Sequence, residues 1–182
     1  MKQNEILVIY GKNYTTLARQ LLEEAHLAEM IGDREKVIGI KPNLVAPVPA
    51  EDGGTTHPEV VEGLIQYLQE HEFRNLRIME GSWVGDRTEE SFEVCGYTAL
   101  AEKYGVQLID CSGMELHLCR CATETDFMIN VPVMKGHCQT HITCALKNMK
   151  GLLPNKEKRR FHAEGLHRPI AHLALGIHQD FI

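Results

Sequence analysis

The chain has 182 residues, of which 43% are hydrophobic, and a formal net charge of −6. This length predicts a single domain over residues 1–182, and no apolar run approaches the roughly 18 residues that cross a membrane. The N-terminus lacks a basic stretch followed by an apolar segment and a cleavage site, so we expect a cytoplasmic protein. The acidic balance argues against nucleic acid as a partner.

Strand-like and helix-like patterns alternate along the chain. Short apolar runs predict strands, and apolar residues at helical spacing predict helices. In chain order, we expect a strand over 5–10, a helix over 15–30, a strand over 36–41, a helix over 57–71, a strand over 76–80, a helix over 91–104, strands over 106–110 and 127–133, and helices over 141–149 and 169–177. This alternation of strands and helices predicts an α/β fold with a mostly parallel sheet and helices on both faces.

The last four residues, 179–182, read as the opening of a further strand. We therefore expect the chain to be an N-terminal fragment of a longer protein. The predicted sheet is then incomplete at the C-terminal end of the domain, and residues beyond Ile182 or another molecule would supply the missing strand.

A polar turn follows the predicted strand over 36–41. Ligands of parallel α/β sheets bind beyond the carboxyl ends of the strands, so this turn is a candidate site. Pro42 removes a backbone donor and restrains the turn, while Lys41 and Asn43 offer donors suited to a phosphate or carboxylate. The alternative is a surface lysine beside a structural turn.

Two other turns carry candidate residues. Thr56 and His57 follow a glycine pair at the start of a predicted helix, where exposed amides and the helix dipole favour an anion. Thr56 is equally suited to cap that helix, and His57 to be a polar neighbour of the cap. Glu80 and Ser82 end the strand over 76–80, where the carboxylate suits a base, a metal ligand or the partner of a lysine. An ordinary turn is the alternative.

Two histidines and a lysine lie close together in an apolar stretch over 131–154. His137 and His141 are four residues apart and would share a face if the segment is helical, which is the spacing of a two-histidine metal pair. Together with Glu80 they could hold a divalent metal. Lys135 nearby disfavours a cation and favours an anion or a proton-transfer role, so Lys135, His137 and His141 are the candidate catalytic residues.

Further cations follow in the same stretch. Lys147 and Lys150 are three residues apart, with Asn148 between them, and would face the same way on a helix. Like charges on an apolar helix are best explained by an anionic ligand, and a solvated helix face is the alternative. We therefore count all three as ligand-binding candidates, and a small anion as the expected partner.

The charge distribution also favours a site in the C-terminal part of the chain. Residues 131–182 carry eight Lys or Arg against three Asp or Glu, a formal charge of +5, which leaves −11 for the preceding residues. Such asymmetry favours an anion-facing surface there.

The six cysteines form no CxxC motif, and Cys119 and Cys121 form only a CxC pair. We expect free thiols.

The chain resembles the family called domain of unknown function 362. The motifs that carry the resemblance are IKPNLV (40–45), THPEVV (56–61), the EGS turn (80–82), DFMINVPVMKGH (126–137), THITCALKNMKGLLP (140–154) and the Phe161–His162 pair. Some members of that family continue into a ferredoxin-like module with iron–sulfur clusters. The resemblance therefore implies an iron–sulfur cluster only if such a module follows Ile182, and it implies no particular reaction.

The order of motifs is also similar, more loosely, to that of the nickel-pincer lactate racemases. Their anion-binding turn would correspond to residues 41–49, their glycine turn to 80–82, their histidine to His137 or His141, and their lysine to Lys150. In those enzymes a lysine holds the cofactor and histidines move the proton. Here LLP stands in place of an LPG-like ending, and the Arg-Pro turn is missing.

Three functions follow from these observations. The first is a small-molecule enzyme or cofactor-binding domain with an anion- or metal-binding site at the strand ends. The second is a non-catalytic scaffold of an iron–sulfur electron-transfer protein. The third is racemase- or isomerase-like proton transfer on a hydroxy acid. Homo-oligomerisation stays open, and we expect no membrane contact.

Overall fold

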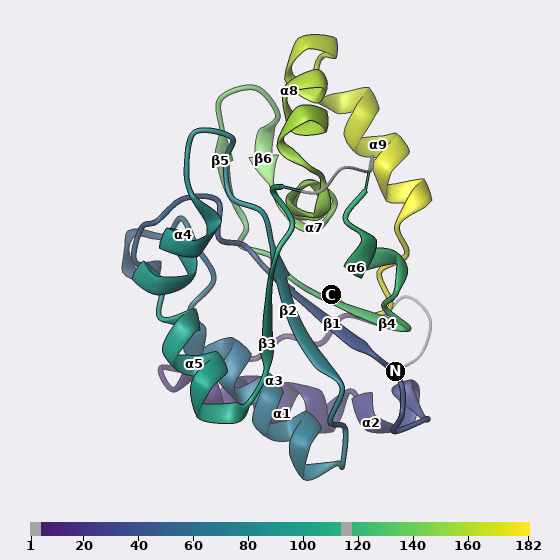
Figure 1. Cartoon of the computed structure of the whole chain (residues 1–182). Helices are drawn as coiled ribbons and strands as arrows, with labels where there is room; N and C mark the ends of the chain where they lie inside the picture. Colours follow the sequence, from purple (N-terminus) through teal and green to yellow (C-terminus); the bar gives the residue numbers. More distant parts are fainter. Residues whose placement is uncertain (1–4, 114–117) are drawn as a thin grey trace.

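A four-stranded parallel sheet forms the centre of the computed structural model, which describes residues 5–113 and 118–182. The strands are β1 (Ile38–Pro42), β2 (Leu76–Glu80), β3 (Gln107–Asp110) and β4 (Phe127–Val131), in the order β3-β2-β1-β4 (Figure 1). Because all pairs are parallel and in close register, the strands end at the same edge of the sheet. The predicted α/β class with a parallel sheet is confirmed.

Helices cover both faces of this sheet, as predicted (Figure 1). One layer holds α1 (Tyr14–Glu24), α2 (Leu27–Ile31), α3 (Pro58–Glu70), α4 (Thr88–Val94) and α5 (Tyr97–Tyr104). The other holds α6 (Arg120–Thr123), α7 (Ala145–Asn148), α8 (Asn155–Glu164) and α9 (His167–Gly176). Two 3-10 turns, η1 (Ala50–Asp52) and η2 (Met149–Leu152), and an antiparallel hairpin of β5 (Lys135–His137) and β6 (His141–Thr143) complete the chain.

The core follows the alternation of side chains along the strands. Ile38 and Ile40 of β1 and Ile78 of β2 pack in the larger cluster, against α1, α3 and α5. Met79 of β2 and Met128 of β4 belong to a second cluster with α6, η2 and α9. Strands β1, β2 and β4 are therefore buried on both faces, whereas β3 at the edge is only partly buried.

The strand expected over residues 5–10 is wrong, because this segment is irregular in the structure. Ile6, Val8 and Tyr10 are exposed, while Leu7 packs against the core. A strand needs a hydrogen-bonding neighbour, and within the described chain no strand or isolated bridge pairs with this segment. Its apolar pattern alone is therefore not enough to make a strand.

The helix expected over residues 141–149 is also wrong. The segment opens as strand β6, and helix α7 begins only at Ala145. His141 has a positive φ of 61°, which a helix excludes. Two other expected helices are each split in two, at His26 (φ 54°) and at Gly96 (φ 78°), because left-handed residues end a right-handed helix.

The last residues approach β4, as the pattern of 179–182 suggested. Phe181 forms an isolated parallel bridge with Ile129, and its carbonyl accepts a hydrogen bond of 2.9 Å from the backbone N–H of Asn130. Asp180 adds a side-chain contact, because its Oδ2 accepts from the N–H of Met128 at 2.8 Å. The chain thus places a fifth backbone segment beside the sheet.

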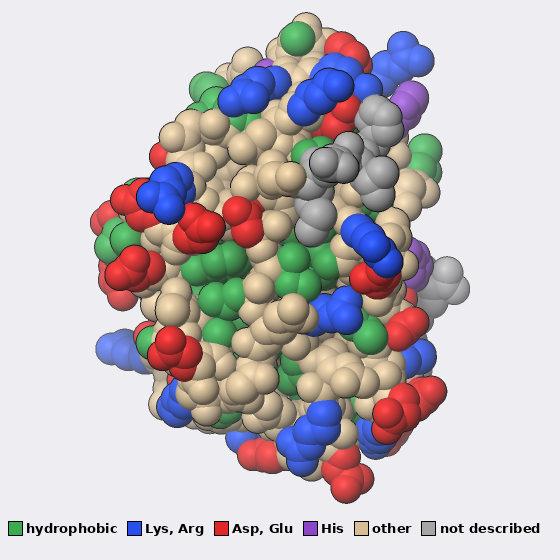
Figure 2. All heavy atoms as spheres, viewed as in Figure 1, with side chains coloured by type: hydrophobic (Ala, Val, Ile, Leu, Met, Phe, Trp, Pro, Cys, Tyr) green, Lys and Arg blue, Asp and Glu red, His purple; other side chains and the backbone are tan. Residues whose placement is uncertain are grey.

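The surface in the view of Figure 1 is mixed in character. Figure 2 shows hydrophobic side chains in the middle of this face, with Lys, Arg, Asp and Glu side chains around them. Within the described part of the chain, no helix is long and apolar enough to cross a bilayer.

Candidate functional site

A pocket of about 390 Å³ opens beyond the carboxyl ends of β1 and β2. Its walls come from the turns after these strands, from the β5–β6 hairpin and from the α7–η2–α8 segment. The lining residues are Asn43, Val45, Glu80, Gly81, Ser82, Trp83, Lys135, Gly136, His137, Thr143, Lys147, Asn148, Lys150, Gly151, Lys158 and His162. This is the edge of a parallel sheet at which α/β proteins bind ligands.

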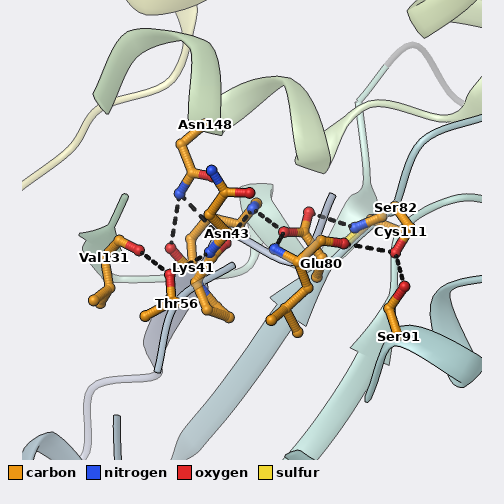
Figure 3. Close-up of polar contacts among 12 residues, drawn as sticks. Lys41, Asn43, Thr56, Glu80, Ser82, Ser91, Cys111, Val131 and Asn148 are labelled. Atoms are coloured by element: carbon orange, nitrogen blue, oxygen red, sulfur yellow. Dashed lines mark hydrogen bonds and ion pairs between the residues drawn. The ribbon is translucent and has the colours of Figure 1, made fainter. Parts of the chain in front are cut away.

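A buried ion pair forms the floor of the pocket (Figure 3). Lys41 Nζ lies 2.8 Å from Glu80 Oε2, and their side chains are 0% and 3% exposed. Glu80 also accepts hydrogen bonds from the backbone N–H groups of Leu44 (2.7 Å) and Gly81 (2.8 Å). Lys41 donates to the carbonyl of Pro42 at 2.6 Å. With three donors around it, the Glu80 carboxylate is neutralised by the protein itself.

Asn148 ties η2 and α7 to the ends of two strands (Figure 3). Its Nδ2 donates to the carbonyl of Lys41 (3.0 Å) and to Asn130 Oδ1 (2.7 Å). On the neighbouring turn, Thr56 Oγ1 donates to the carbonyl of Val131 at 2.8 Å and accepts from the N–H of Asn43 at 2.8 Å. These amides and hydroxyls hold the turns of the pocket in a fixed arrangement.

Four lysines surround the pocket without carboxylate partners. Across residues 5–113 and 118–182, no Asp or Glu forms an ion pair with Lys135, Lys147, Lys150 or Lys158. Lys158 Nζ instead donates to the carbonyls of Gly81 (2.7 Å) and Ser82 (2.9 Å), and Lys135 Nζ donates to the carbonyl of Gly54. Because Glu80 is already paired with Lys41, the pocket carries a net positive charge.

Burial makes these ammonium groups easier to deprotonate. It lowers the pKa of Lys150 to about 8, and the charges of Lys147 and Lys158 act in the same direction. Burial also lowers the pKa of Lys158 to about 8, although Glu80 opposes the shift. The pKa values of Lys135 and Lys147 are lowered as well, again chiefly by burial.

Lys150 begins a chain of hydrogen-bonding side chains. Its Nζ lies 2.7 Å from His162 Nε2, and His162 Nδ1 lies 3.1 Å from Gln139 Oε1. An amide oxygen only accepts, so we assign the ring proton to Nδ1, which leaves Nε2 to accept from Lys150. Burial and the nearby Lys150 lower the pKa of His162, which keeps the ring neutral. Trp83 packs edge-on against His162, with ring centroids 4.8 Å apart.

His137 and His141 face each other across the hairpin instead of sharing a helix face. His137 lines the pocket, and its Nδ1 accepts from the N–H groups of Gln139 and Thr140 at 3.2 Å each. Burial, and then the charge of Lys147, lowers the pKa of His137. His141 is exposed and does not line the pocket.

Most of the other candidates from the sequence line the pocket, two lie buried behind its wall, and His57 lies elsewhere. Asn43, Glu80, Ser82, Lys135, Lys147, Asn148 and Lys150 line the pocket with His137. Lys41 and Thr56 are buried behind its wall, where they bond to Glu80 and Val131. His57 precedes α3, with its Nδ1 3.8 Å from Glu59 and its ring against Tyr14.

Several residues of the pocket, among them Trp83, Thr143 and Lys158, were not site candidates from the sequence. Trp83 follows the EGS turn directly, and its place after a strand was an available signal. Lys158 and His162 lie four residues apart on α8, a helix that was not predicted because its basic run read as a solvated surface. Their apolar neighbour Phe161 was the one sign of a buried face.

Glu80, His137 and His141 do not gather as a metal site. Among the described residues, the one group of three potential ligands within 4.8 Å of one another is Cys111, Cys119 and Cys121, which could hold a metal ion. Cys119 and Cys121 are paired as a disulfide, so the expectation of free thiols is wrong for these two. The CxC spacing brought them together, and the fold added Cys111 from the end of β3.

Comparison with known proteins gives a family and one distant relative. The family model described as a domain of unknown function, DUF362, matches residues 38–182. A thylakoid-associated protein of Synechocystis sp. is 29% identical over 143 residues, which cover 73% of this chain and 43% of that protein. The chain therefore spans less than half of that relative's length. No solved structure matches the chain.

Proposed function

We propose that this chain, which belongs to the DUF362 family, binds a small anionic ligand in the pocket beyond β1 and β2. The observation that carries the proposal is the group of four lysines that no carboxylate of the described chain pairs with. Bringing like charges together at a partly buried site is costly unless an anion neutralises them. A carboxylate or phosphate group has the required charge and acceptor oxygens.

Thr143 supplies a further argument for a polar ligand. Its side chain lines the pocket and is 3% exposed, yet its Oγ1 forms no hydrogen bond with the described part of the chain. A buried hydroxyl without a partner costs free energy, and a ligand oxygen that reached it would remove this cost. The volume of the pocket, about 390 Å³, lies in the range of small-molecule binding sites.

The single tryptophan makes the proposal directly measurable. Trp83 lies in the pocket, 5.8 Å from Lys150 Nζ, so a bound anion should change its fluorescence. The titration uses inorganic phosphate and short mono- and dicarboxylates, and the pattern of response separates phosphate from carboxylate recognition. We expect saturable binding that weakens as salt is added, because salt screens the lysine charges.

Matched variants locate the binding. Lys147→Ala combined with Lys150→Ala should abolish the response, whereas Lys156→Ala, an exposed lysine on α8, should leave it unchanged. Thr143→Val keeps the shape of the side chain and should weaken binding about three- to tenfold through one lost hydrogen bond. Equal affinity in the wild type and the Lys147/Lys150 double variant would sink the proposal.

The hydrogen-bonded chain from Lys150 to Gln139 favours a second function, proton transfer on the bound ligand. Near pH 8 a lysine with a lowered pKa exists partly as the free amine, which can take a proton, and His162 Nε2 lies within reach to accept or return it. The reaction would be proton abstraction next to a carbonyl or hydroxyl group of a small acid. Deuterium uptake in deuterium oxide, at carbon 2 of 2-hydroxy acids and at carbon 3 of 2-oxo acids, tests it. Uptake that Lys150→Gln does not reduce would contradict this role.

A further inference from the structure

Three cysteines meet in the second core cluster, outside the anion pocket. Cys111 follows β3, Cys119 precedes α6, and Cys121 lies within α6. Their sulfur atoms all lie within 4.8 Å of one another, and that of Cys111 is 3.7 Å from that of Cys121. The three residues are 0%, 0% and 4% exposed.

Backbone hydrogen bonds place these cysteines. The N–H of Cys111 donates to the carbonyl of Glu80 at 2.8 Å, which fixes it at the end of β2. The N–H of Cys119 donates to the carbonyl of Leu152 at 2.9 Å, which fixes it on η2. Cys111 thus comes from the sheet and the other two from the start of α6, so the group exists only in the folded chain.

The side chains around the three sulfurs are apolar, and several of them are methionines. The same cluster contains Met79, Met128, Met149, Leu152 and Ile177. Within the described ranges, no imidazole or carboxylate joins the three cysteines at ligand distance. A hard cation such as Mg²⁺ or Ca²⁺ finds no oxygen ligands here, and a structural zinc ion would lack its fourth donor.

We propose that the reduced Cys111, Cys119 and Cys121 bind one Cu(I) ion as three thiolates. Soft thiolate donors select Cu(I), and three sulfurs at about 2.3 Å from a central ion in a plane lie about 4 Å apart. The separation of Cys111 and Cys121 fits this arrangement, and Cys119 meets it once it is no longer bonded to Cys121.

The two states of the site are related by a balanced reaction. A thiol reductant supplies two electrons and two protons to the Cys119–Cys121 disulfide, giving two thiols and the oxidised reductant. Binding of Cu(I) then displaces the protons of the thiols that become ligands. In the oxidised protein this site therefore holds a disulfide and the free thiol of Cys111, and in the reduced protein it holds the metal.

The test uses the full chain, reduced and kept under argon, and Cu(I) delivered from a competing Cu(I) chelator. We expect one Cu(I) per chain in the wild type and in Cys95→Ser, a buried cysteine outside the group. Replacing any one of Cys111, Cys119 or Cys121 by Ser should remove this stoichiometric binding. Binding that survives in all three variants, or that is missing in the wild type, would overturn the proposal.

X-ray absorption on the loaded wild type gives a second readout that needs no variant. We expect three sulfur neighbours around copper and no nitrogen or oxygen ligand. Fewer sulfurs, or stoichiometric Zn²⁺ held in preference to Cu(I) with a fourth ligand, would refute the assignment. Because this site lies outside the lysine pocket, phosphate and carboxylate binding should be unaffected in Cys111→Ser if that variant keeps its far-ultraviolet circular dichroism.

Discussion

The buried ion pair of Lys41 and Glu80 supports the turns that form the pocket, and within it the charge of Lys41 neutralises that of Glu80. Both side chains are almost fully buried, and every oxygen of Glu80 has a donor from the protein. A buried pair of this kind adds little net stability compared with apolar residues, but removing one partner leaves a buried charge alone. The pair therefore fixes the turns after β1 and β2 more than it stabilises the fold.

Glu80→Gln should lower the free energy of unfolding by about 3 kcal/mol, because Lys41 then keeps its charge without a counterion. Urea denaturation followed by circular dichroism measures this. Glu89→Gln breaks an exposed pair with Arg87 and should change stability by less than about 0.5 kcal/mol. In the double variant with Lys41→Met, the loss should be smaller than the sum of the single losses. Full additivity would contradict a coupled pair.

The affinity for an anion should be highest below pH 8 and fall as the pH rises through about 8. Lys150 and Lys158 have pKa values lowered to about 8, so their ammonium charge is lost there and not near 10.5. The charged groups facing Lys150 are Lys147 and Lys158, with the neutral ring of His162 beside it. Trp83 fluorescence titrations at several pH values measure the effect.

Lys150→Met gives the control for this pH dependence. Affinity should be lower at neutral pH and should fall less steeply above pH 8, because one of the titrating charges is gone. The variant should also be more stable than the wild type near pH 7, by about 1 kcal/mol, since a buried ammonium with a lowered pKa destabilises the folded state while it is charged. This difference should shrink as the pH rises toward 10.5. An unchanged pH profile would argue against Lys150 as a ligand-facing charge.

At the scale of elements, the 3-10 turn η2 packs closely against the ion pair at the ends of β1 and β2. Gly151 lies directly over the buried ion pair, and a Cβ there would collide with Glu80 Oε1 and stand 2.6 Å from Lys41 Cε. The φ of Gly151 lies outside the left-handed region, so close approach, not backbone conformation, requires glycine at this position. This explains why the segment after α7 contains a glycine amid bulky residues.

Gly151→Ala should therefore destabilise the protein by at least about 2 kcal/mol and weaken anion binding, because η2 must move away from β2. A Cβ at Gly176 in α9 would meet no atom within 4 Å, so Gly176→Ala is the matched control. That control should be neutral or slightly stabilising, as alanine is in a helix. Thermal unfolding and Trp83 titration of both variants measure the two effects. A Gly151→Ala protein as stable as the control would contradict this packing.

Periodicity is misleading where short elements build the site. Residues 141–149 have apolar positions that fit a helix, yet the structure forms strand β6 and the short helix α7. Hairpin pairing with β5 supplies the backbone hydrogen bonds of residues 141–143, and this partner lies across a turn that periodicity does not detect. Helix α8 was not predicted, because charged residues dominate 156–160 and obscure the helical pattern. One face of this helix is nevertheless buried, and Lys158 lies on that face.

At the scale of the whole molecule, one sheet joins the two helical layers. The large cluster on one face and the second cluster on the other share strands β2 and β4, and the third cluster joins the second through Leu118 and Leu173. We therefore propose that residues 1–182 form one cooperative domain, in keeping with the length. The basic lining of the pocket comes from the β5–β6 hairpin and from the second layer.

Urea unfolding should show a single transition with the same midpoint by two probes. Far-ultraviolet circular dichroism reports all helices, and Trp83 fluorescence reports the pocket between the sheet and α8. Because the first two clusters share strands and the third packs on the second, loss of one should expose the others. Two separated midpoints, with the fluorescence change first, would mean that the α8–α9 layer unfolds independently. Adding a bound anion should raise both midpoints together through mass action.

Much of the fold and part of the site could be predicted from the sequence alone. Strand β2 has the predicted bounds, and β1, β3, β4, α3 and α9 differ from theirs by a few residues, because each has a long apolar pattern and a clear stop. Lys41 and Glu80 were recognised as polar residues after strands. Their pairing with each other could not be assigned, because it depends on which strands are neighbours.

The sequence by itself determined the α/β class, the strand ends as the site of polar residues, and the excess of positive charge after residue 131. These properties depend on local patterns of side chains, which a linear chain already contains. Only the tertiary structure decided that His141 lies outside the pocket, that Lys158 and His162 line it, and that Cys111 joins the CxC pair. Each of these depends on contacts between segments distant in the chain, whose free energy arises only when the sheet and its two layers pack together.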